Sequence, residues 1–87
     1  MTPKRRGRGV ENDQYAALVR RVIAAYSRRV AAGDIDAISD MTSIAAELDD
    51  AISQAVTGLR MAGYSWADIA ERLGVTRQAA QQRWGRG

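Results

Sequence analysis

Residues 64–85 read YSWADIAERLGVTRQAAQQRWG, and this stretch decides the fold of the chain. It begins with a helix start signal, because the Ser65 hydroxyl can accept a hydrogen bond from a backbone N–H of the first turn. Asp68, three residues later, can reach back to complete a capping box, although Glu or Gln is more usual there. Apolar residues then recur at spacings of three and four. The pattern predicts a short helix over residues 66–73.

A tight turn and a second helix follow. Gly74 can adopt the left-handed conformation that ends a helix at little cost. Val75 is expected to fill the corner of the turn, and Thr76 can cap the next helix. This helix is expected over residues 77–84, so the stretch forms two short helices joined by a turn.

This spacing resembles the bacterial helix-turn-helix DNA-binding motif. In that family a small residue lies four positions before the turn glycine, and Ala70 and Gly74 stand at those two positions. The residues at the family's buried apolar positions are Ile69, Leu73, Val75 and Ala80, with Trp84 closing the core behind the second helix. A position late in the second helix that is usually aliphatic is Arg83 here, so Trp84 is expected to take over its packing. Residues 58–84 are also similar to sigma-factor region 4 and to small actinobacterial proteins.

The resemblance implies that the second helix is a recognition helix that enters the major groove of double-stranded DNA. Arg can donate two hydrogen bonds to guanine, Gln can pair with adenine, and Thr can contact a phosphate or a thymine methyl group. The candidate DNA-binding residues are Thr76, Arg77, Gln78, Gln81, Gln82 and Arg83, with Ser65 before them, Arg86 after them, and Arg5, Arg6 and Arg8 near the N-terminus.

Two other interpretations of the same helices stay open. The outward face of the second helix can be an ordinary solvated surface of Gln and Arg. The hairpin can also serve as a protein–protein adaptor or an architectural DNA-binding protein. Adaptors usually present apolar or aromatic anchors, whereas Arg77, Gln78, Gln81 and Gln82 are hydrogen-bonding groups suited to base edges. A small transcriptional regulator that binds specific DNA sequences is therefore the first hypothesis, with a transcription-machinery protein as a further expected partner.

The composition excludes several classes of site. The chain of 87 residues has no cysteine and no histidine. It therefore lacks a thiol nucleophile, the commonest general base and two of the commonest metal ligands. No nucleophile–base pair is legible, and we expect no enzymatic activity, no cofactor and no metal. No apolar run reaches the roughly 18–20 residues of a membrane span. We expect a cytoplasmic, nucleoid-associated protein with no membrane contact.

Charge is concentrated at the two ends of the chain. Residues 1–9 hold four cations and no acid, residues 10–63 hold five arginines against eight acids, and residues 64–87 hold four arginines against two acids. Residues 1–10 are expected to be a disordered basic arm. Arg6-Gly7-Arg8 resembles the centre of an AT-hook without its proline, so the arm is expected either to lie along DNA or to be a solubilising tail.

Residues 11–32 are expected to form a long helix that Gly33 ends. Its broad apolar stripe comprises Tyr15, Leu18, Val19, Val22, Ile23, Tyr26 and Val30. Packing within the domain is the usual use of such a stripe, and a homodimer interface is the other. Since one recognition helix covers only a few base pairs, we expect a homodimer through this helix; the alternative is a monomer whose basic arm supplies the missing contacts.

The rest of residues 11–63 is expected to hold a short helical turn and another long helix. Asp34 can cap the turn over residues 34–41, and Thr42 or Ser43 can cap the next helix, which would end at Gly63. Its expected buried ridge is Ile44, Leu48, Ala51, Ile52, Ala55, Leu59 and Ala62. Asp49 and Asp50 are interpreted as surface charge. The chain is therefore expected to be a small all-α bundle of about four to five helices, with residues 11–63 as a scaffold and residues 64–87 as the helix-turn-helix.

Overall fold

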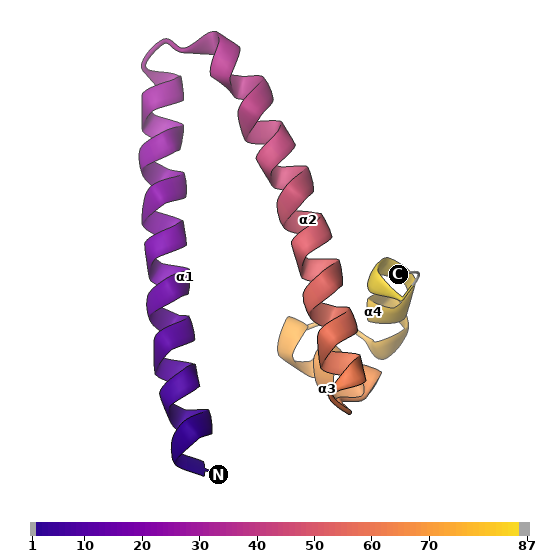
Figure 1. Cartoon of the computed structure of the whole chain (residues 1–87). Helices are drawn as coiled ribbons and strands as arrows, with labels where there is room; N and C mark the ends of the chain where they lie inside the picture. Colours follow the sequence, from indigo (N-terminus) through magenta and orange to yellow (C-terminus); the bar gives the residue numbers. More distant parts are fainter. Residues whose placement is uncertain (1, 86–87) are drawn as a thin grey trace. The chain divides into compact units, whose positions relative to one another are not determined.

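The structure, a computed structural model, describes the backbone of residues 2–85 and the side chains of residues 11–85. Within this part the chain is all-α, as expected, and contains no strand. The elements are α1 (Thr2–Ala31), the short 3-10 helix η1 (Ile35–Ala37), α2 (Ile38–Met61), α3 (Trp66–Leu73) and α4 (Arg77–Trp84), as Figure 1 shows. The chain divides into two compact units, Met1–Asp40 and Met41–Gly87, which are described separately.

The first unit consists mainly of α1. This helix begins at Thr2, further towards the N-terminus than the expected start near residue 11. Residues 2–10, which are expected to be disordered, therefore belong to this helix. Their side chains lie outside the described part, so contact between the basic arm and DNA stays a prediction. At its other end α1 stops where expected, because Gly33 takes a φ of 139° that L side chains rarely adopt. The Asp34 carboxylate then caps η1 by accepting a hydrogen bond of 3.3 Å from the Ala37 N–H.

The predicted break between the short turn and the next long helix is wrong. η1 runs directly into α2, which begins at Ile38, so Thr42 and Ser43 lie inside α2 and do not cap it. The reason is local, since residues 38–43 contain neither Pro nor Gly, and a helix that has already been started by Asp34 meets nothing that would end it.

In the second unit α3 and α4 pack against each other beside the C-terminal half of α2 (Figure 1). The buried residues of the described chain are Val56 from α2, Ile69 and Ala70 from α3, and Ala80 from α4. Two of these are alanines that are almost fully covered, with exposed fractions of 2% for Ala70 and 0% for Ala80. Small side chains at these positions allow α3 and α4 to approach each other closely.

Several residues expected in the core are exposed instead. Leu73 and Val75 keep exposed fractions of 43% and 41%, because none of the described helices of this unit covers the outer side of the turn. Trp84 is half-buried, as its expected position at the back of the core requires. On α2 the buried residue is Val56, which the expected ridge omits, whereas Ile44, Leu48 and Leu59 of that ridge are exposed. α3 and α4 cover only one side of α2, and Val56 lies on that side.

Candidate nucleic-acid interface

The start of α3 is fixed by a complete capping box. The Ser65 hydroxyl accepts a hydrogen bond from the Asp68 N–H, and the Asp68 carboxylate accepts one from the Ser65 N–H, both at 3.0 Å. The Ser65 N–H bond is also the main reason why the pKa of Asp68 lies below its usual value, with the Ser65 side chain next and the nearby Arg72 adding a smaller effect. Ser65 is one of the predicted DNA-binding residues. In the structure its hydroxyl oxygen accepts the hydrogen bond that caps α3.

The turn between α3 and α4 has the geometry that the sequence predicts. Gly74 takes a φ of 71°, in the left-handed region. The N–H of Val75 donates to the Ala70 carbonyl at 3.1 Å, so the free carbonyls at the end of α3 are satisfied as in a Schellman motif. The α3 and α4 boundaries agree with the predicted ranges, and the turn therefore sets the angle at which α4 leaves α3.

α4 begins at the predicted cap and turns its polar residues outward. The Thr76 hydroxyl accepts a hydrogen bond from the Ala79 N–H at 3.0 Å. Ala80 is the buried residue of this helix. Gln78 and Gln82 stand two positions before and after Ala80, so each projects about 160° away from it around the helix axis. Both side chains are exposed, and they form the centre of the outward face of α4.

Arg77 and Gln81 extend this outward face along one edge. Both are exposed and lie one turn apart on α4, so their side chains are neighbours. Together with Gln78 and Gln82 they place one guanidinium and three carboxamides on a single surface at the end of the chain. We call these four residues the α4 face. Each carries donors, and each carboxamide also carries an acceptor, as direct contact with base edges requires.

Arg83 is the exception among the predicted residues of α4, because it contacts α2. Its Nη2 donates a hydrogen bond to Asp49 Oδ1 at 3.3 Å. The guanidinium carbon also lies 5.0 Å from the centre of the Trp84 ring, within the range of a cation–π contact. Arg83 therefore connects the end of α4 to α2.

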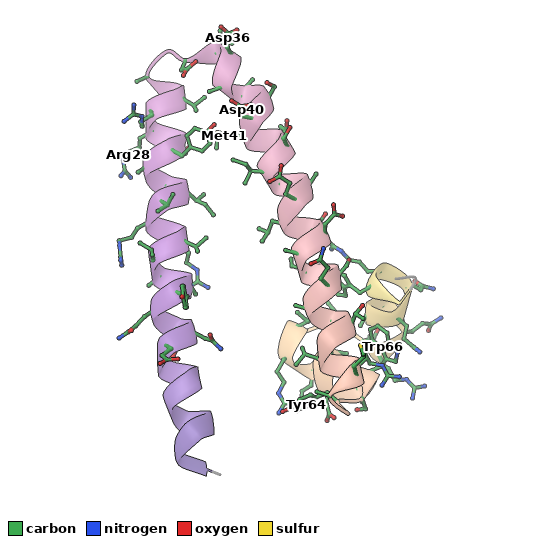
Figure 2. All side chains as sticks on the ribbon, viewed as in Figure 1. Arg28, Asp36, Asp40, Met41, Tyr64 and Trp66 are labelled. Carbon is green, nitrogen blue, oxygen red and sulfur yellow. The ribbon has the colours of Figure 1, made fainter. Side chains whose placement is uncertain are left out.

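The junction between α2 and α3 is held by a second arginine. Arg60 Nη1 donates a hydrogen bond to the Tyr64 carbonyl at 3.0 Å, and its guanidinium carbon lies 5.3 Å from the centre of the Trp66 ring. Figure 2 shows Tyr64 and Trp66 on different sides of this junction. Trp66 and Trp84 line the same hollow, next to Val56. The helical hairpin is thus attached to α2 at both of its ends.

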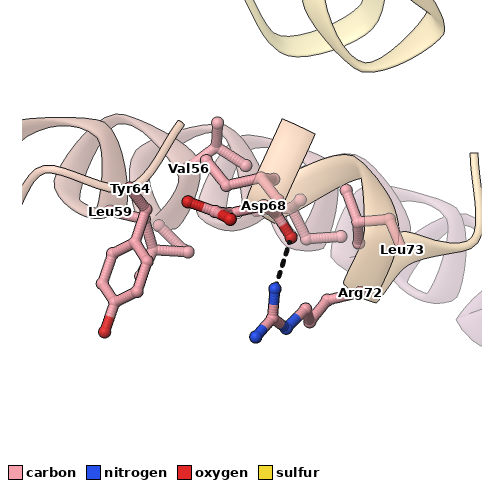
Figure 3. A pocket seen from close by; sticks show the side chains of 9 residues that line it. Val56, Leu59, Tyr64, Asp68, Arg72 and Leu73 are labelled. Atoms are coloured by element: carbon pink, nitrogen blue, oxygen red, sulfur yellow. Dashed lines mark hydrogen bonds between the residues drawn. The ribbon is translucent and has the colours of Figure 1, made fainter. Parts of the chain in front are cut away.

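An open apolar groove, which the sequence interpretation missed, lies between α2 and α3 (Figure 3). Its volume is about 380 Å³, and Val56 and Ile69 form part of its wall. Exposed Leu59, Tyr64 and Leu73 also line it. At one edge Arg72 Nη1 donates a hydrogen bond to the Asp68 carbonyl at 3.1 Å. The sequence contains a signal for this groove, because α2 and α3 carry more apolar residues than their contacts cover. Their periodic spacing predicts instead that these residues lie in a closed core.

The remaining predicted residues fall outside what the structure describes. These are the side chains of Arg5, Arg6 and Arg8, and the whole of Arg86. Among residues that it does describe, no group of three carboxylates is gathered closely enough to hold a metal ion. No helix in the same part is both long enough and apolar enough to cross a bilayer.

Comparison with known proteins finds bacterial relatives. The chain is 39% identical over 61 residues to uncharacterized proteins of Mycobacterium bovis and of two strains of Mycobacterium tuberculosis. The match covers 66% of this chain but 24% of each relative, so the chain spans about a quarter of the length of these proteins. No protein-family model matches the chain, and no solved structure matches it significantly.

Proposed function

We propose that the chain binds double-stranded DNA in a sequence-specific manner through α3 and α4, and that it acts as a small transcriptional regulator in the bacterial cytoplasm. The observation that carries this proposal is the α4 face. Four hydrogen-bonding side chains project from a helix whose opposite side, at Ala80, is fully buried. The fixed turn at Gly74 holds this face away from the core, as a helix that enters the major groove requires.

The chemistry of the α4 face favours contact with bases as well as with phosphates. Arg77 can donate two hydrogen bonds to the O6 and N7 atoms of guanine. Gln78, Gln81 and Gln82 can each pair with the N6 and N7 atoms of adenine. The N-terminal end of α4 adds backbone N–H groups and a positive potential, both of which favour a neighbouring phosphate. The face carries no acidic residue that would repel the DNA backbone.

We assign different tasks to the other predicted residues. Arg83 positions α4 on α2 and contributes little to the DNA surface, because its guanidinium is already bound to Asp49. Arg5, Arg6 and Arg8 are proposed to lie along phosphates or in the minor groove. Deletion of residues 1–9 is then expected to weaken binding to all sequences and to flatten its salt dependence. Since one recognition helix reads few base pairs, we propose that two copies act together.

A binding selection from randomised duplex DNA tests the function. It is run at about 150 mM salt, where non-specific binding is weak. The wild type is compared with Arg77→Ala/Gln78→Ala, and with Arg28→Ala/Gln54→Ala as a control that changes the same residue types outside α4. We expect the wild type and the control to enrich the same DNA motif. The Arg77→Ala/Gln78→Ala variant is expected not to enrich it. Failure of the wild type to enrich any motif would contradict the proposal.

The groove between α2 and α3 supports a second candidate function, that of a protein–protein adaptor. Exposed Leu59, Tyr64 and Leu73 are apolar or aromatic residues of the kind that anchor protein interfaces. Tyr64→Glu/Leu73→Glu places two charges in the groove and leaves the α4 face unchanged. If DNA selection enriches no motif, and a transcription-machinery protein binds the wild type but not this variant, the adaptor function is favoured.

A further inference from the structure

A row of large apolar side chains lies along α1. Tyr15, Leu18, Val19, Val22 and Ile23 recur at spacings of three and four and therefore share one side of the helix; we call them the α1 stripe. All five are exposed, with fractions from 46% for Ile23 to 68% for Tyr15. A contiguous exposed row of this kind marks an interaction surface more often than ordinary solvent-facing helix.

Opposite charges border the two ends of the α1 stripe. Glu11 lies one turn before Tyr15, and it lines one surface hollow together with Tyr15 and Leu18. Arg29 lies two turns after Val22 and projects in nearly the same direction as Val22. Glu11 and Arg29 are about five turns apart, so they lie on the same edge of the stripe. That edge has an acid at one end and a base at the other.

This charge pattern is complementary to itself in only one orientation. When two identical helices pair around a two-fold axis in antiparallel fashion, each edge meets the same edge of the other copy with its ends reversed. Glu11 would then face Arg29 of the partner subunit, and this contact would occur twice. A parallel pair would instead bring like charges together at both ends. We propose that the α1 stripe binds the α1 stripe of a second copy of this chain in antiparallel orientation.

The surface is sufficient for a reversible dimer. Covering the five side chains in both copies removes on the order of 1,000 Å² from water, about the lower limit for a specific interface. The charges at the rim select the orientation, whereas the apolar stripe supplies most of the affinity. This inference defines the surface and register of the proposed pairing of two copies. It does not depend on DNA binding, because the pairing is measured without DNA.

Sedimentation velocity of the full chain over a range of concentrations tests the pairing. Glu11→Arg is expected to raise the dimer dissociation constant about tenfold, and Arg29→Glu to do the same. The combined Glu11→Arg/Arg29→Glu variant reverses both charges and is expected to return the constant to within about twofold of the wild type. Asp13→Arg and Arg28→Glu are matched controls, because these residues project away from the stripe, and they are expected to leave it unchanged.

Cross-linking then tests the orientation, since the chain contains no natural cysteine. A mixture of Glu11→Cys and Arg29→Cys chains is expected to form disulfide-linked dimers on mild oxidation, whereas each variant alone forms few. Dimers from Glu11→Cys alone would show a parallel pair and overturn the proposal. A monomer at every concentration would overturn it too, and would mean that something other than a second copy covers the stripe. Equal effects of the control and test substitutions would place the interface elsewhere.

Discussion

Arg83, in the last turn of α4, donates a hydrogen bond from Nη2 to Asp49 Oδ1 on α2, at 3.3 Å. The two residues are 34 positions apart in the chain. Both side chains remain more than half exposed, so the pair is screened by water and is expected to be weak. The Arg83–Asp49 pair matters because of its position, since it joins α2 to the helix that carries the α4 face.

A double-mutant cycle of Asp49→Ala and Arg83→Ala measures this pair. We expect a coupling of about 0.2–1 kcal/mol in the free energy of unfolding, decreasing at high salt. Both single variants are expected to weaken DNA binding by a similar small factor, since each removes the same contact between α4 and α2. A large loss of affinity in Arg83→Ala, with none in Asp49→Ala, would show instead that Arg83 contacts DNA directly.

Ala80→Val tests the close packing of α4 on the core. Ala80 has an exposed fraction of 0%, so two added methyl groups have no room without movement of α2 or α3. We expect the free energy of unfolding to fall by about 1–3 kcal/mol, measured by urea denaturation. Ala79→Val is the control, because Ala79 is exposed on the same helix and should lose only about 0.5 kcal/mol of helix propensity. Equal losses would contradict the burial of Ala80.

Gly74→Ala tests the left-handed turn. Gly74 has a φ of 71°, and an L side chain there costs about 1–2 kcal/mol even though nothing lies within 4 Å of the added Cβ. Gly58→Ala is the opposite control, because Gly58 lies inside α2 with equally open surroundings. Alanine in a helix interior is expected to raise stability by about 0.5–1 kcal/mol. The two substitutions should therefore shift the melting temperature in opposite directions.

The capping box predicts a pH dependence that Asp68→Ala removes. The pKa of Asp68 is lowered from its usual value of 3.8 by the bonds to Ser65. A carboxyl group with a lowered pKa in the folded state stabilises the fold above its unfolded pKa, and this contribution is lost as the pH falls through the folded pKa. Asp68→Ala should be less stable than wild type at neutral pH, and the difference should shrink below about pH 3.8. A difference that stays constant down to pH 2 would contradict this assignment.

The C-terminal hairpin shows how far local signals alone can carry a prediction. Ser65, Gly74 and Thr76 act within three or four residues of their own positions, through caps and backbone conformation. Such interactions do not depend on the rest of the chain. For this reason the boundaries of α3 and α4 and the outward direction of Gln78 and Gln82 could be derived from the sequence.

The sequence by itself determined the all-α class, the caps of α3 and α4, the turn between them and the chemistry of the α4 face. Only the tertiary structure decided which apolar residues are covered, because periodicity identifies an apolar side of a helix but not the element that lies against it. Val56 is buried and Leu59 is exposed for that reason. The attachment of Arg83 to Asp49 was decided in the same way, since a contact between residues far apart in the chain exists only once α2 and α4 are packed together.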